Sequence, residues 1–102
     1  MADEPGYELR VESSVLGSQL TVIPHVQAAA GAVLRYEIVS TKQGSAGKSD
    51  TRQSGKVAVG EAGSAKLSTL KLGVSPQDRY SISVKVFDGT KLVAEKVLNY
   101  PQ

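Results

Sequence analysis

The sequence predicts an all-β domain, a seven-stranded antiparallel β-sandwich. Three features of the 102-residue chain support this prediction. Apolar and polar residues alternate over short segments, as they do in half-buried strands. Turn-forming residues separate these segments about every 10–15 residues, which is close to the spacing in sandwiches. No segment has the periodicity of an amphipathic helix of useful length.

The first two strands are predicted on either side of Gly17-Ser18. In the first, Tyr7, Leu9 and Val11 share one face. The second covers residues 20–27, and its Pro24 predicts an edge or an irregularity because proline cannot donate a ladder hydrogen bond. The three alanines that follow end at a glycine and are too few to nucleate a helix, so they are predicted as a turn.

Five further strands are predicted from the same two-fold alternation. The third begins at Leu34 and has a charged outer face, and the fourth becomes apolar at Val57 after a long polar run. Asp88-Gly89 is a strong hairpin signal, because glycine tolerates the positive φ of a tight turn. The remaining strands are expected at residues 65–72, 80–86 and 92–98, with a turn at 60–63.

The connection between the fifth and sixth strands narrows the fold class. The run Leu70, Leu72, Pro76, Asp78, Tyr80, Ile82 and Val84 matches the tyrosine corner of immunoglobulin-like and fibronectin-like domains. There a tyrosine hydroxyl bonds the backbone a few residues upstream, which is the structural role predicted for Tyr80. Ile82 takes the inward position that often holds cysteine, and Tyr36 is expected to replace the usual core tryptophan. The alternative is a tyrosine that lies in a strand by coincidence.

Length and composition predict one domain at 7–100, preceded by a disordered tail at 1–6. Residues 1–6 lack the charged and apolar regions of a signal peptide, and no stretch is long enough to span a membrane. Without cysteine, disulfides and thiolate metal sites are excluded. These features fit either a cytoplasmic protein or a mature exported domain.

No group of residues predicts an enzyme, a metal site or a cofactor. His25 is the only histidine and is expected on an outer face, so a paired-histidine metal site is excluded. The carboxylates lie beside cations or in turns, where the ionised form is favoured, unlike a general acid. Residues 44–49 resemble the end of a phosphate-binding loop, but the upstream glycine is replaced by Lys42 and a strand follows instead of a helix.

The polar run from Lys42 to Lys56 is the candidate working surface. It carries four cations and one carboxylate, and it contains no large apolar residue. Alternation puts Arg52 and Lys56 on one face of the fourth strand, beside Arg35 of the third if these strands pair. Such a face suits an anionic or amide-rich extended chain, whereas nucleic acid is disfavoured because no aromatic lies in the run. The alternative is a solvated, slightly cationic loop.

The same run carries a family resemblance. The block Gly44, Gly47, Ser49, Thr51 and Gln53-Ser54-Gly55, with strands on either side, resembles the CsgH family of curli-assembly chaperones from alphaproteobacteria. The resemblance implies an immunoglobulin-like sandwich, a periplasmic location after signal cleavage, and suppression of premature amyloid formation by the curli major subunit. The related CsgC has a Cys-x-Cys motif; this chain has no cysteine, so no redox role carries over.

By analogy with this family, the client-binding residues are predicted to be Lys48, Arg52, Lys56, Arg35 and Lys42, and the structural residues Tyr80, Tyr36, Ile82 and Gly55. We expect a monomeric, non-enzymatic periplasmic chaperone without cofactors. Its partner would be the unfolded curli major subunit, and neither nucleic acid nor membrane insertion is expected. The alternative function is an immunoglobulin-like adhesion or fibre-subunit module. A carbohydrate-binding sandwich ranks last because few aromatics remain to be exposed.

Overall fold

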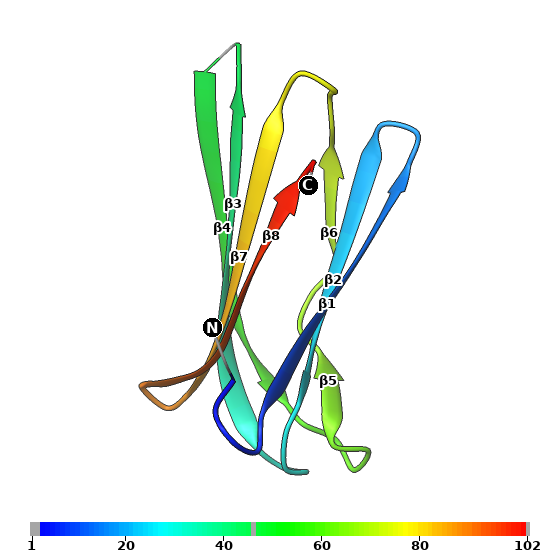
Figure 1. The fold of residues 1–102 in the computed structure, drawn as a ribbon. Helices are drawn as coiled ribbons and strands as arrows, with labels where there is room; N and C mark the ends of the chain where they lie inside the picture. Colours follow the sequence, from blue (N-terminus) through cyan, green and yellow to red (C-terminus); the bar gives the residue numbers. More distant parts are fainter. Residues whose placement is uncertain (1–2, 46, 102) are drawn as a thin grey trace.

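The computed structural model describes residues 3–45 and 47–101 as an all-β protein of two antiparallel sheets (Figure 1). The described residues form eight strands, one more than predicted. The segment expected at 65–72 divides into two strands because Leu67, Ser68 and Thr69 leave the ladder. The strands are β1 (Glu8–Leu16), β2 (Gln19–Gln27), β3 (Val33–Gly44), β4 (Gly47–Ala58), β5 (Ser64–Lys66), β6 (Leu70–Gly73), β7 (Arg79–Asp88) and β8 (Lys91–Tyr100).

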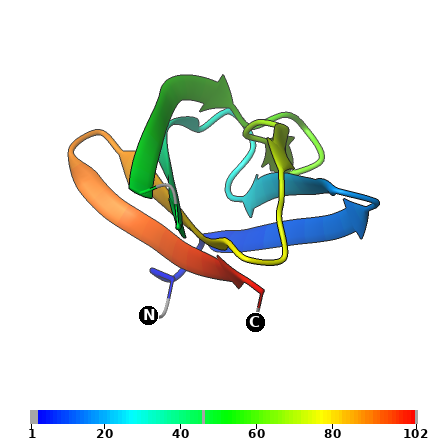
Figure 2. The ribbon, with the colours of Figure 1, turned by 90° about the horizontal axis from the view of Figure 1, so that it is seen from above.

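One sheet has the order β1-β2-β5, with β6 also paired to β2, and the other has the order β4-β3-β7-β8. Figures 1 and 2 show the two sheets facing each other and diverging towards the β1–β2 and β3–β4 hairpins. The described residues include no helix long and apolar enough to cross a membrane.

The core fills the space between the sheets, and strand alternation selects its members. Leu9, Val22 and Val26 point inward from the first sheet and are fully buried. From β7, Ile82, Val84 and Val86 do the same, so Ile82 occupies the inward position predicted for it. Aliphatic side chains alone therefore join the two sheets at a position where related folds often use cysteine.

Pro24 lies in a central strand, so the expectation of an edge is wrong and that of an irregularity is confirmed. β2 pairs with β1 on one side along its whole length. On its other side it pairs with β6 at residues 19–22 and with β5 at residues 25–27. Pro24 occupies the gap between β5 and β6, where no ladder partner requires the N–H that proline lacks. Its carbonyl accepts a hydrogen bond of 2.9 Å from Leu67 N.

The tyrosine corner is present. Tyr80 Oη donates a hydrogen bond of 2.9 Å to the carbonyl oxygen of Gly73, seven residues upstream, and only 6% of Tyr80 is exposed. Because Gly73 ends β6 in one sheet and Tyr80 is the second residue of β7 in the other, this bond ties the two sheets together at their connection.

Tyr36 and Gly55 face each other across the β3–β4 ladder. The ring of Tyr36 covers Gly55 so closely that a β-carbon there would lie 2.7 Å from Tyr36 Oη and 2.9 Å from Cζ. An aromatic ring packed over a glycine near a sheet edge replaces the side-chain contacts that glycine lacks. Tyr36 is half-buried and packs against the core, so both residues have structural contacts.

The N-terminal segment binds the edges of β1 and β8. Asp3 Oδ2 accepts a hydrogen bond of 2.8 Å from Leu9 N, and Glu4 N donates one of 2.9 Å to Val93 O. Tyr7 Oη donates to Asp88 Oδ2 at 2.6 Å, and this bond raises the pKa of Tyr7 above its usual value. Residues 1–2 of the predicted tail lie outside the described residues.

Removing the corner hydroxyl is expected to destabilise the fold. Tyr80→Phe leaves the Gly73 carbonyl without its donor, which should lower the free energy of unfolding by about 1 kcal/mol. Tyr100→Phe is the matched control, because Tyr100 is half-buried against the Tyr80 ring and no described residue accepts a hydrogen bond from it. Urea unfolding followed by circular dichroism measures both, and equal midpoints for the two variants would contradict a structural role for the bond.

A side chain at position 55 should collide with Tyr36. Gly55→Ala is expected to lower the free energy of unfolding by about 1–3 kcal/mol, the usual cost of overpacking. In a Tyr36→Leu background the same change should cost less than about 0.5 kcal/mol, a coupling that a double-mutant cycle measures. Gly73→Ala is the control, since a β-carbon there has no neighbour within 4 Å. An equal cost in both backgrounds would show that Tyr36 does not require the glycine.

Candidate functional site

The candidate site is the outer face of the sheet β4-β3-β7-β8. Directly paired residues point to the same side of a sheet, so the register gives its members. Lys48, Arg52 and Lys56 of β4 lie opposite Gln43, Val39 and Arg35 of β3. We call this surface the cationic face. Its charged residues on the four strands are the cations Arg35, Lys48, Arg52, Lys56, Arg79 and Lys85 and the carboxylates Glu37, Asp50 and Glu95.

Four of the five predicted client-binding residues lie on this face, and the fifth does not. Lys42 is opposite Ser49 and Tyr80, on the inner side of the sheet. Its Nζ lies 3.4 Å from Oδ2 of Asp78, a carboxylate that is only 14% exposed. Side chains along a strand alternate between its two faces. The outer positions of β3 are odd-numbered, so the side chain of Lys42 points to the opposite face from the other four residues. Lys42 belongs to the connection between the sheets rather than to the cationic face.

Sequence analysis missed two cations of this face, Arg79 and Lys85. Both lie on β7, opposite Gln43 and Glu37 of β3. The signal was present in the sequence, because they alternate with the apolar run from Tyr80 to Val86. Strand β7 is therefore a second source of positive charge, two strands away from the polar run at 42–56.

The cations differ in their partners. Arg35 Nη1 lies 4.0 Å from Glu37 Oε2, and its guanidinium lies 4.9 Å from the centre of the Phe87 ring. Lys85 Nζ lies 3.9 Å from Glu95 Oε2. Within residues 3–45 and 47–101, no carboxylate comes within 4.0 Å of the charged nitrogens of four others: Lys48, Arg52, Lys56 and Arg79. The positive potential is therefore concentrated on β4 and at the start of β7.

The cations of β4 stand on a projecting ribbon. Every described residue from Gly47 to Ser54 is exposed, including the inward-pointing Ser49 and Thr51. Figure 1 shows the reason, since the two sheets diverge at this end and no strand of the other sheet covers β4 there. Both faces of the ribbon are thus accessible to a partner, one charged and one lined by hydroxyl and amide groups.

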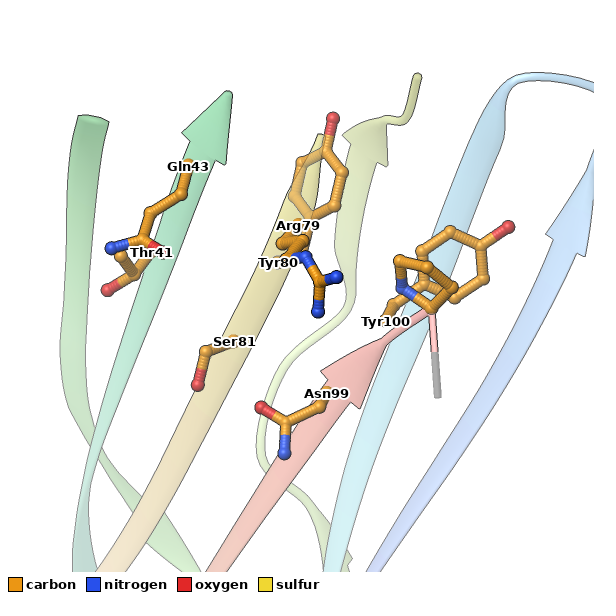
Figure 3. Close-up of a pocket in the computed structure, with 8 residues that line it drawn as sticks. Thr41, Gln43, Arg79, Tyr80, Ser81, Asn99 and Tyr100 are labelled. Carbon is orange, nitrogen blue, oxygen red and sulfur yellow. The ribbon is translucent and has the colours of Figure 1, made fainter. Parts of the chain in front are cut away.

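A hollow of about 350 Å³ lies on the same sheet, over β3, β7 and β8. The polar side chains that line the hollow occupy outer positions of β3, β7 and β8. Figure 3 shows the guanidinium of Arg79 directed from β7 towards the strand that carries Asn99. Neutral hydrogen-bonding groups around a guanidinium that has no carboxylate partner in the described part of the chain suit a carboxylate or amide side chain. The lining residues are Thr41, Gln43, Arg79, Tyr80, Ser81, Asn99, Tyr100 and Pro101.

His25 lies on the other sheet, where Nε2 contacts Glu12 Oε1 at 2.8 Å in an exposed position. This pair is exposed to solvent, unlike the enclosed, apolar setting typical of an acid–base catalytic group. The chemistry that the cationic face supports is electrostatic attraction and hydrogen bonding. Each exposed ion pair on it would contribute only about 0–1 kcal/mol.

Known proteins are similar to this chain in both sequence and fold. The family model described as thin aggregative fimbriae synthesis protein, Tafi-CsgC, matches residues 8–97. The curli assembly protein CsgC of Escherichia coli is 36% identical over 76 residues, which cover 74% of this chain and 69% of that protein.

Among solved structures, the Escherichia coli curli protein CsgC superposes with a TM-score of 0.72 and 28% identity, covering 94% of this chain and 99% of the other. The solution structure of CsgH from R. palustris gives a TM-score of 0.69 over 91% of each chain, and at 22% identity it shows a common fold. The chain therefore belongs to the Tafi-CsgC family of thin aggregative fimbriae synthesis proteins, as its resemblance to CsgC-like and CsgH proteins implied.

Proposed function

We propose that this protein acts in curli assembly as a chaperone that delays amyloid polymerisation of the unfolded major subunit. The observation that carries the proposal is the set of four cations, Lys48, Arg52, Lys56 and Arg79, that lack a carboxylate partner among the described residues. Membership of a family whose relatives are curli assembly proteins supports the choice of client.

The mechanism is attraction followed by rapid release. Unpaired charges on an exposed sheet steer an acidic chain over distances of about one Debye length and raise its encounter rate. Each contact then contributes little, because both partners remain solvated. A client that is met often and held briefly stays soluble without being captured, and this mode of action requires neither a cofactor nor a catalytic group.

Further properties of the proposal follow from the family and the fold. We assign the sandwich to the immunoglobulin-like class, which the Tyr80–Gly73 corner supports. Kinship with the CsgC proteins supports a periplasmic location. We expect a monomer with client-binding residues Lys48, Arg52, Lys56 and Arg35, joined by Arg79. The rival function, an adhesion or fibre-subunit module, predicts stable stoichiometric complexes or self-association instead.

Reversing the charge of β4 should abolish inhibition. For the triple variant Lys48→Glu, Arg52→Glu and Lys56→Glu, the protein concentration that doubles the lag time of curli-subunit fibrillation should rise about tenfold or more. Three contacts of about 0.5 kcal/mol each are lost and replaced by repulsion. Thioflavin fluorescence measures the lag time, and circular dichroism verifies the fold.

The matched control reverses three cations on the outer face of the other sheet, Arg10→Glu, Lys66→Glu and Lys71→Glu. It changes the net charge equally and should inhibit like the wild type. Equal loss in both triple variants would mean that net charge acts rather than the cationic face. Undiminished inhibition in the β4 variant would remove β4 from the mechanism.

A further inference from the structure

The two sheets together present edges on two sides of the sandwich, and the β1–β8 side is blocked at Leu9 and Val93. Leu9 of β1 directs both backbone groups away from β2, and both are occupied. Its N–H donates to Asp3 Oδ2 at 2.8 Å and its carbonyl accepts from Lys96 Nζ at 2.9 Å. Beside it, Val93 O of β8 accepts from Glu4 N. No additional strand can reach these groups without displacing residues of this chain.

The other side ends in β4, the last strand of its sheet. Among the described residues, no hydrogen bond beyond the β3 ladder reaches the backbone of Gly47–Ala58. The one bonded side chain of β4 is that of Gln53, whose Oε1 accepts from Ser68 Oγ at 2.9 Å. The edge of β4 therefore keeps free backbone donors and acceptors that an extended chain can pair with.

The residues that supply these groups follow from the alternation of antiparallel pairs. In the β1–β2 hairpin, Leu9 lies seven residues from Leu16, which closes the two-residue turn, and its backbone points outward. Gly47 closes the equivalent turn of the β3–β4 hairpin, and seven residues on is Ser54. Residues at an odd number of positions from Gly47 therefore direct their backbone N–H and C=O groups away from β3. They are Lys48, Asp50, Arg52, Ser54 and Lys56.

The side chains around this edge select the incoming strand. Cations at every fourth position, Lys48, Arg52 and Lys56, lie on one face together with the single carboxylate Asp50, whereas Ser49, Thr51 and Gln53 lie on the other. An added strand with acidic residues opposite the cations gains favourable cross-strand pairs. On the second face, amide side chains match the hydroxyl and amide groups and form the ladders typical of glutamine- and asparagine-rich strands.

We propose that β4 accepts an acidic, amide-rich extended segment as a fifth strand of its sheet. The inference rests on the proposed function and adds to it the backbone contact by which the client is recognised. Charge brings the segment to the cationic face, and backbone pairing along β4 aligns it there. Pairing with β4 occupies one of the two edges of a bound segment, so that edge is unavailable to another amyloid strand while the segment is bound.

A second copy of this chain fits the edge less well. In the full antiparallel overlap centred on Arg52, the two arginines face each other and Lys48 faces Lys56 of the other copy, while Asp50 faces Ser54 and so is not opposite a cation. Like charges directly opposite each other destabilise a pair of strands. Charged edges of this kind are a common protection against edge-to-edge association, so the same cations disfavour self-pairing and favour an acidic partner.

The test uses a nine-residue peptide with glutamate at positions one, five and nine, asparagine at three and seven, and glutamine elsewhere. This order reads the same in both directions, so parallel and antiparallel strands place acids opposite the same cations. Two N-methylated versions of this peptide are compared. One is methylated at the backbone nitrogens of positions three and seven, and the other at those of positions four and six. Strand addition predicts that their affinities, measured by NMR titration of the full chain, differ by about 3- to 10-fold or more.

The protein variant Ser54→Pro makes the complementary change without altering charge. Proline is tolerated at an edge position whose N–H points outward, so β3 pairing should persist. We expect about 3- to 10-fold weaker peptide binding and correspondingly weaker inhibition of curli-subunit fibrillation. Ser54→Ala, which keeps the N–H, and Ser13→Pro, at an outward position of β1, should match the wild type.

The outcomes separate this inference from the proposed function. If both N-methylated peptides bind equally and Ser54→Pro inhibits normally while charge reversal of β4 abolishes inhibition, strand addition is wrong and electrostatic contact remains. If charge reversal has no effect either, both proposals fall. Concentration-dependent shifts of β4 amides without peptide would show that a second copy occupies the edge, which also overturns the inference. If Ser54→Pro unfolds, the peptide comparison on the wild type decides alone.

Discussion

The pairing register of β3 with β4 determines what this protein presents to solvent. With Arg35 opposite Lys56 and Val39 opposite Arg52, the cations of β4 point outward, away from the hydrophobic core. A slip of one residue would turn Lys56 towards the core and expose Val57, because side chains alternate with a period of two. The position of the charge therefore depends on interactions that hold this single pair of strands in place.

Two contacts on the inner side of the sheet select that register. Tyr36 needs a residue without a side chain opposite it, and Gly55 meets that need. At the hairpin end, Lys42 pairs with Asp78, whose carboxylate occupies the space that a side chain at Gly44 would need. The structural role of Gly55 and the inner position of Lys42 are thus parts of one arrangement that directs Lys48, Arg52 and Lys56 outward.

Much of the fold was predictable because its signals are local. Alternation predicts the strands, and the spacing from Leu70 to Tyr80 predicts a tyrosine hydroxyl bonded to the backbone upstream, as Tyr80 is to Gly73. The division of the fifth strand was not predictable, since it depends on how β2 changes partners around Pro24. The cationic face was predictable in part: alternation indicated Arg52 and Lys56, but Arg79 joins them only through the pairing of β3 with β7.

The structure also distinguishes its edges. Asp3, Glu4 and Lys96 occupy the outward backbone groups of Leu9 in β1 and the carbonyl of Val93 in β8, whereas the described residues leave β4 with charged side chains as its main protection. Those charges repel a like strand and attract an acidic one, so one property serves both solubility and recognition. Weak exposed contacts then suit a chaperone whose client must leave again.

The central claim is that fixed charge on one exposed sheet brings the client to the protein. The salt dependence of inhibition by the wild type tests it most directly, because raising the ionic strength from about 0.01 M to about 0.15 M shortens the Debye length from about 30 Å to about 8 Å. We predict that the extension of the curli-subunit lag time, corrected for the effect of salt on the subunit alone, falls several-fold over this range. An extension that stays constant would contradict the electrostatic account.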